Sequence, residues 1–115
     1  LCILMADCPN LEEFTIAITS EADSLKAADL ARKLLKQKLV ACISIHKVDS
    51  YYWWEDELVN SQEFQLTMKT TSDHINKLQA VVFQLHSYDT PEWIQLPFSP
   101  SASYGKWIHS VLPNS

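Results

Sequence analysis

Hydrophobic residues recur at two different spacings in the first third of the chain. They alternate with polar or small residues from Phe14 to Thr19, which predicts a strand with one buried face. The spacing then becomes helical as far as Lys38, which predicts an amphipathic helix lying on a sheet. The residues available to cap this helix are Ser20, Asp23 and Ser24. The stripe expected to be buried consists of Leu25, Ala28, Ala31, Leu34 and Leu35.

β-Branched and aromatic residues dominate the next stretch, from Leu39 to about Trp54, and predict a long second strand. Polar residues 55–57 predict a turn, and an alternating run that contains Phe64 and Met68 predicts the returning strand. Together these segments form an unusually long β-hairpin. Period-two alternation then sorts the start of the second strand into two faces. Ala41, Ile43 and Ile45 are expected to face the helices, and Cys42, Ser44 and His46 the opposite side.

A second helical pattern follows, with Ser72 or Asp73 as its expected cap and its end before Pro91. Its apolar stripe consists of Ile75, Leu78, Val82 and Leu85. Residues 93–96 predict a short fourth strand, and residues 104–112 predict a last helix. The order βαββαβ plus a C-terminal helix predicts an α+β fold of the ferredoxin-like split βαβ type. Such a fold has an antiparallel sheet with both helices on one face.

Length and composition fit one domain. The 115 residues are expected to form a domain over 14–115, preceded by a poorly ordered appendage over 1–13. The formal net charge of −5 disfavours nucleic acid and anionic membranes as partners, because both attract clustered Lys and Arg. The three cysteines form neither a C-x-x-C pair nor an even disulfide framework, which favours a cytoplasmic location.

The aromatic run at 51–54 indicates a partner for the sheet. Two helices cover only one face of the predicted sheet, whereas Tyr51, Tyr52, Trp53 and Trp54 put rings on both faces. A contiguous exposed aromatic patch favours association in a soluble protein. The bare face is therefore expected to meet another copy of the chain.

The densest polar chemistry lies in residues 86–92, directly after the second predicted helix. An imidazole, a phenol and two carboxylates occur there, at His86, Tyr88, Asp89 and Glu92. Such a cluster is able to bind a cation or a small ligand. The alternatives are a histidine at a helix end and a solvated turn, and the pattern alone does not separate them.

Other candidate groups carry weaker signals. Cys42 and His46 share a face but lie about 13 Å apart along a strand, too far to share one metal ion within a chain. Cys42 is equally well explained as a small, half-buried apolar residue. His74 and His109 are expected to be exposed helix residues. The sequence contains no nucleophile elbow, Walker loop or H-E-x-x-H motif, so it is not expected to be an enzyme.

Several sequence blocks, in a fixed order between about Phe14 and Leu112, resemble the CutA family of divalent cation tolerance proteins. They include Tyr-Trp-Trp-Glu at 52–55, Met-Lys-Thr at 68–70 and His-Ser-Tyr-Asp-Thr-Pro-Glu at 86–92. The resemblance implies a ferredoxin-like domain in a tight homotrimer that binds copper or other divalent cations. It also implies an alternative, a small-molecule signalling module, because the trimeric nitrogen-signalling proteins have a similar architecture and bind ligands at intersubunit clefts.

Carried over residue by residue, the resemblance implies a metal site at Cys42 and His86, with no other cofactor. The candidates for the surrounding cleft are Tyr52, Trp54, Glu63, Lys69, Tyr88, Asp89 and Glu92. In the expected mechanism, Cys42 of one chain and the 86–92 loop of the same or a neighbouring chain hold the cation. In the alternative, Lys69 is an anion partner for Glu63 or for the ligand. Two departures from the family pattern are Ser87, where proline is usual, and a hairpin turn around 56–57 without glycine.

Overall fold

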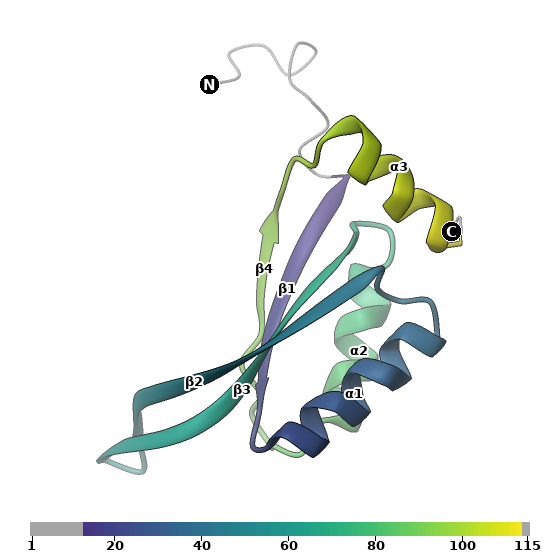
Figure 1. The fold of residues 1–115 in the computed structure, drawn as a ribbon. Coiled ribbons are helices and arrows are strands. Elements are labelled where there is room, and N and C mark those ends of the chain that lie inside the picture. Colours follow the sequence, from purple (N-terminus) through teal and green to yellow (C-terminus); the bar gives the residue numbers. More distant parts are fainter. Residues whose placement is uncertain (1–12, 114–115) are drawn as a thin grey trace.

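The computed structural model describes residues 13–113, so most of the predicted appendage over 1–13 lies outside the described residues. Four strands and three helices follow one another as β1 (Phe14–Glu21), α1 (Ser24–Lys36), β2 (Cys42–Trp54), β3 (Glu57–Thr71), α2 (Ile75–Leu85), β4 (Ile94–Pro97) and α3 (Ala102–Val111). The strands form one antiparallel sheet in the order β2-β3-β1-β4. Figure 1 shows α1 and α2 side by side on one face of this sheet. The predicted α+β fold, with its βαββαβ order and C-terminal helix, is confirmed.

The main core lies between the sheet and the two covering helices. Leu66 and Met68 of β3 are fully buried and belong to the same cluster as Leu34 of α1 and Leu78 and Val82 of α2. Because side chains alternate along a strand, the neighbouring positions of β3 point to the other face of the sheet. That second face, which α1 and α2 leave uncovered, is called the open face below.

The buried stripe of α1 differs from the predicted one. It consists of Ala27, Leu30, Ala31 and Leu34. Leu25, which was expected in the core, is 81% exposed, and Leu35 is also exposed. Each helical residue advances by about 100°, so Leu25 lies on the opposite side of the helix from Ala27. An Ala-rich face therefore packs on the sheet, and the bulkier Leu25 remains in solvent.

The two ends of α1 explain where β2 begins. Asp23, one of the predicted caps, accepts a hydrogen bond from the Lys26 N–H at 2.8 Å. At the other end Lys38 has a φ of 58°, and the N–H groups of Lys38 and Leu39 donate to the carbonyl oxygens of Leu35 and Leu34. This is a Schellman motif with lysine in the position that usually holds glycine. Leu39 belongs to this motif, so the second strand starts at Cys42 rather than at Leu39 as predicted.

The start of α2 also differs from the prediction. His74 is its N-cap, with no side-chain capping bond, so neither Ser72 nor Asp73 has the predicted role. The Nδ1 atom of His74 lies 2.6 Å from the Thr71 hydroxyl, and the residue is only 9% exposed. The prediction that His74 is an exposed helix residue is therefore wrong. The hydrogen bond to β3 holds this ring inside the fold.

The hairpin of β2 and β3 is the longest feature of the molecule and extends beyond the body of the domain (Figure 1). Trp54 pairs with Glu57, so the loop contains only Glu55 and Asp56, whose φ values are 50° and 64°. Positive φ at both central residues is the property of a type I′ turn, which matches the twist of the strands but favours glycine or asparagine. The twist of a long hairpin imposes this turn on two acidic residues.

The third helix closes one end of the open face. Phe14, Ile108 and Leu112 form a small buried cluster there, and Ala41 packs against it. Ala41 was expected to face the other helices with Ile43, but only Ile43 contacts the main core. Ala41 lies before the first residue of β2, so strand alternation does not apply to it. Within residues 13–113, no helix is both long and apolar enough to cross a membrane.

Candidate functional site

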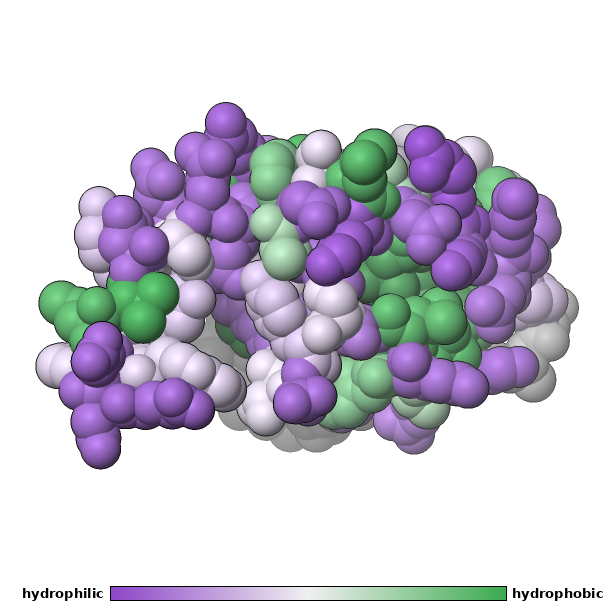
Figure 2. Space-filling model, turned by 90° about the horizontal axis from the view of Figure 1, so that it is seen from below, coloured by the Kyte–Doolittle hydropathy of each residue, from purple (hydrophilic) through white to green (hydrophobic). Residues whose placement is uncertain are grey.

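A cleft of about 710 Å³ lies between the hairpin and the loop that follows α2. Figure 2 shows the hairpin standing away from the body, with a hollow between the two. The residues that line the cleft are Ser20, Ser50, Tyr51, Tyr52, Trp54, Val59, Glu63, Tyr88, Asp89, Thr90, Pro91 and Glu92. Six of the nine residues predicted for the site are therefore brought together within one chain.

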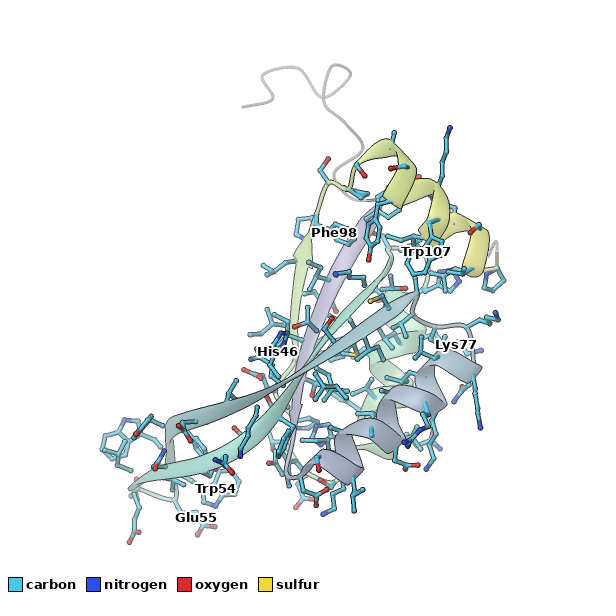
Figure 3. All side chains as sticks on the ribbon, in the orientation of Figure 1. His46, Trp54, Glu55, Lys77, Phe98 and Trp107 are labelled. Carbon is cyan, nitrogen blue, oxygen red and sulfur yellow. The ribbon has the colours of Figure 1, made fainter. Side chains whose placement is uncertain are left out.

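The aromatic wall of the cleft comes from alternate positions of β2. Tyr52 and Trp54 share the open face, and the Tyr52 hydroxyl lies 3.0 Å from that of Ser61 on β3. Trp54 lies near the turn of the hairpin, beside Glu55, in Figure 3. Its side chain is 56% exposed. Tyr51 belongs to the other face of β2 but also lines the cleft, so both faces of the strand contribute rings to the aromatic wall.

Two hydrogen bonds between side chains hold the 88–92 loop against the sheet. The Tyr88 hydroxyl donates to Glu63 Oε2 on β3 at 2.9 Å. The Ser20 hydroxyl of β1 donates to Glu92 Oε1 at 2.6 Å. Burial, followed by the hydrogen bond and the charge of Glu63, raises the pKa of Tyr88. The phenol therefore remains a neutral donor and the Glu63 carboxylate its acceptor.

The charges around the cleft have one sign. Glu63, Asp89 and Glu92 are among its lining residues, and no lysine or arginine within residues 13–113 lines it. Each of the two hydrogen-bonded carboxylates has further lone pairs, because an ionised carboxylate offers about four acceptor positions. The cleft therefore has a negative potential and attracts positively charged groups.

His86 lies behind this loop rather than in the cleft. Its side chain has no exposed surface, and its ring lies 5.0 Å from that of Tyr88 between centroids. Nδ1 accepts a hydrogen bond from the Tyr88 N–H at 3.0 Å and is 3.6 Å from Glu21 Oε2. Nε2 is buried and has no hydrogen-bond partner among residues 13–113. The helix-end position expected for His86 is confirmed, and the ring supports Tyr88 from within the fold.

Glu21 and Ser87 complete this support, and sequence reasoning missed both roles. Glu21 is only 2% exposed and accepts hydrogen bonds from the Ser87 N–H, at 3.1 Å, and from the Ser87 hydroxyl. A proline at position 87 would lack both donors. The departure from the family pattern at Ser87 thus provides two bonds that tie the loop to β1. A carboxylate at the end of an otherwise apolar and hydroxylic strand was the available signal for Glu21.

Cys42 and Lys69 lie at the other end of the open face. They pair directly across β2 and β3, and the Lys69 ammonium lies 5.7 Å from the centre of the Tyr104 ring on α3. Six strand positions, about 20 Å, separate Lys69 from Glu63, so the predicted Lys69–Glu63 pair does not form within one chain. Lys69 does not line the cleft.

Cys42 and His86 are also far apart in one chain. Cys42 pairs with Lys69, which in turn pairs with Ile16 of β1. His86 contacts Glu21, which lies five positions after Ile16 on β1 and on the other face of the sheet. The separation along the strand is roughly 17 Å. Of the two arrangements expected, Cys42 with the loop of its own chain is therefore excluded by the geometry. Only a contribution from a neighbouring chain remains.

The remaining histidines do not complete a metal site within the chain. His46 projects from the open face in the middle of β2 (Figure 3), and His109 is exposed, as predicted, with Nε2 2.8 Å from Glu13 Oε1. Among residues 13–113, no group of three or more His, Cys, Asp or Glu side chains is placed to hold a metal ion. A cation in the cleft would need ligands from water or from a second chain.

The sequence and the fold are both similar to those of known proteins. Residues 15–111 match the family model described as CutA1 divalent ion tolerance protein. A divalent-cation tolerance protein CutA from Thermotoga maritima is 38% identical over 89 residues, which is 76% of this chain and 88% of that protein. A CutA structure from Synechococcus elongatus superposes with a TM-score of 0.86 at 28% identity, covering 89% of this chain and 92% of that one.

A second similar structure is that of a protein described as periplasmic. It is described as the periplasmic divalent cation tolerance protein CutA from Archaeoglobus fulgidus and has a TM-score of 0.83 at 27% identity. The match covers 85% of this chain and 97% of that chain. Each of the two matches covers more than four fifths of this chain.

Proposed function

We propose, from the premise that this chain belongs to the family of CutA1 divalent ion tolerance proteins, that it contributes to metal tolerance by binding divalent cations. The observation that carries the proposal is the set of three carboxylates in a cleft that no lysine or arginine of the described residues lines. Carboxylate oxygens are the usual ligands of hard divalent cations. We assign no catalytic step to the protein.

The proposed binding form is a homotrimer. The hairpin exposes large apolar residues on both of its strands, including Trp53, which is 72% exposed, and Leu58. β2 is also an edge strand of the sheet, and an exposed edge favours pairing with another chain. Association would cover these surfaces and would add side chains of a second copy to the cleft.

Copper binding is the finer part of the proposal. A thiolate and an imidazole are the ligands that copper prefers in proteins. We assign these roles to Cys42 of one chain and His86 of a neighbour, with the cleft carboxylates nearby. The buried ring of His86 becomes accessible only if the 86–92 loop opens, and Nε2, which has no hydrogen-bond partner among the described residues, is then the nitrogen free to bind the metal.

Calorimetric titration with copper tests the proposal on the intact chain, with light scattering to measure the mass in solution. We expect Cys42→Ala, His86→Ala and Glu63→Gln each to weaken copper binding by at least tenfold. His46→Ala is the matched control, because it removes an exposed histidine of β2 outside the cleft. Unchanged copper affinity in all three variants, each with the mass of the unaltered protein, would contradict the proposal.

A second candidate function, a cytoplasmic small-molecule signalling module, is favoured by the size and lining of the cleft. A volume of about 710 Å³ is in the range of organic ligand pockets, and the rings of Tyr51, Tyr52 and Trp54 offer a large apolar surface. A hydrated metal ion needs neither. Binding of an organic molecule in the absence of metal would support this candidate over the first.

A further inference from the structure

The cleft combines two kinds of surface that favour the same ligand. Aromatic faces from Tyr52, Trp54 and Tyr88 lie in one hollow with the carboxylates of Glu63 and Glu92. Ring faces carry partial negative charge and attract cations, most strongly for tryptophan. Carboxylates attract the same groups directly and accept their hydrogen bonds.

The two carboxylates are held in place before any ligand arrives. Tyr88 fixes Glu63 on β3, and Ser20 fixes Glu92 at the end of the loop. Preorganised groups lose less conformational entropy on binding, so each retained contact contributes more to affinity. Both donors are hydroxyl groups, which leave the negative charge of the carboxylates uncompensated.

We propose that this cleft binds a small organic ammonium compound, of which an alkyl diamine is the simplest example. The inference rests on the second candidate function, and it gives that function a ligand class. Ammonium groups would donate hydrogen bonds to Glu63 and Glu92, and the hydrocarbon chain between them would lie against Tyr52 and Trp54. An anionic metabolite would be repelled by the same carboxylates, and its only predicted partner, Lys69, lies outside the cleft.

The charge of the ligand is tested with 1,4-diaminobutane and its uncharged counterpart 1,4-butanediol, each titrated calorimetrically into the full chain without metal. We expect the diamine to bind and the diol to bind at least tenfold more weakly. Diamine binding should also weaken when the salt concentration is raised from 0.05 to 0.5 M, because salt screens partly exposed charges. Equal affinity for the two compounds, or no binding of the diamine, would overturn the proposal.

Paired variants locate the site. Trp54→Leu should weaken diamine binding about fivefold, a size typical of one cation–π contact. Trp53→Leu should leave it unchanged, because Trp53 is more exposed than Trp54, points to the opposite side of β2 and does not line the cleft. Equal losses in the two variants would place the ligand elsewhere on the hairpin.

Glu92→Gln removes the charge but keeps an oxygen that can accept the Ser20 hydrogen bond, so the loop should stay in place. We expect diamine binding to fall at least fivefold, whereas Glu57→Gln, which changes an exposed hairpin carboxylate outside the cleft, should have no effect. An unchanged affinity in Glu92→Gln would contradict the assignment.

A copper titration of the Trp54→Leu variant separates this inference from the metal proposal. The indole ring is not a metal ligand, so the affinity for copper should be unchanged in the variant in which diamine binding is weakened. Copper binding without diamine binding in the unaltered protein would overturn the inference alone. Diamine binding without copper binding would overturn the metal proposal alone.

Discussion

The two ends of the open face use similar residues to opposite effect. At one end the ring of Tyr104 on α3 lies near the Lys69 ammonium, and Phe14 and Ile108 fill the space between helix and sheet. At the other end no lysine or arginine of residues 13–113 lines the cleft beside Tyr52, Trp54 and the carboxylates. The chain thus supplies its own helix and its own cation at one end and leaves the other end open. A region with aromatic and acidic groups but no internal partner is where a ligand or another chain is expected.

The largest effect on stability is expected at the end of the open face that α3 covers, which is called the closed end. Ile108 has no exposed surface, so Ile108→Ala should lower the free energy of unfolding by about 2–4 kcal/mol. Trp54→Leu at the open end should lower it by less than about 1 kcal/mol, because half-exposed side chains bury less apolar area. Urea unfolding followed by circular dichroism measures both. Comparable losses would mean that the cleft end contributes to the core after all.

The loop behind the cleft supplies the next largest effect. Ser87→Pro removes both donors to the buried Glu21 carboxylate and should lower the free energy of unfolding by about 1–3 kcal/mol. Ser87→Ala keeps the N–H donor and should lose about half as much. Urea unfolding of the two variants gives the difference. A Ser87→Pro variant as stable as the unaltered protein would show that the family's usual proline serves the loop equally well.

Tyr88→Phe tests whether the Tyr88 hydroxyl anchors the loop, because the substitution removes its hydrogen bond to Glu63 and keeps the ring. It should lower the free energy of unfolding by about 1 kcal/mol, whereas Tyr104→Phe, which keeps its ring near Lys69, should change it little. Urea unfolding at neutral pH compares the two variants directly. Equal losses would remove the distinction between a phenol that anchors a loop and a ring that packs beside a cation.

The pH dependence of the same variant provides a second measurement. The folded-state pKa of Tyr88 is raised above the ordinary value near 10, so its contribution to stability is complete below about pH 10 and is lost as the pH rises further. The unaltered protein should therefore lose more stability than Tyr88→Phe between pH 9 and 11. Parallel curves for the two proteins would contradict the role assigned to the phenol.

The fold could be predicted from sequence because its signals are periodic and local. Alternation at Phe14–Thr19 and helical spacing up to Lys38 identified the right elements in the right order. The errors occur where a tertiary contact decided the outcome. Leu25 is apolar but exposed, because the alanine-rich face of α1 fits closer to the sheet. His74 is polar but buried, because Thr71 gives it a partner.

The candidate site could be predicted only in part, and the division is instructive. Tyr52, Trp54 and Glu63 lie on the same face of the hairpin, because side chains alternate along each strand and the register of β2 and β3 aligns these positions. Their meeting with residues 88–92 depends on loop contacts to Ser20 and Glu63, which no spacing rule contains. The position of His86 depends on contacts of the same kind: its polar character favoured the cleft, but the Tyr88 N–H and Glu21 hold it behind the loop.

The smallest expected effect concerns the turn that carries the aromatic wall outward. Asp56 has a φ of 64°, in the left-handed region that favours glycine, so Asp56→Gly should raise the free energy of unfolding by about 0.5–1 kcal/mol. Lys38→Gly, at a φ of 58° in the Schellman motif of α1, is the matched change in the body of the domain. If the hairpin unfolds together with the body, urea unfolding should show similar gains for both. A gain for Lys38→Gly alone would show that the hairpin opens independently, and that the open end of the molecule is a separate unit held in place only when something binds it.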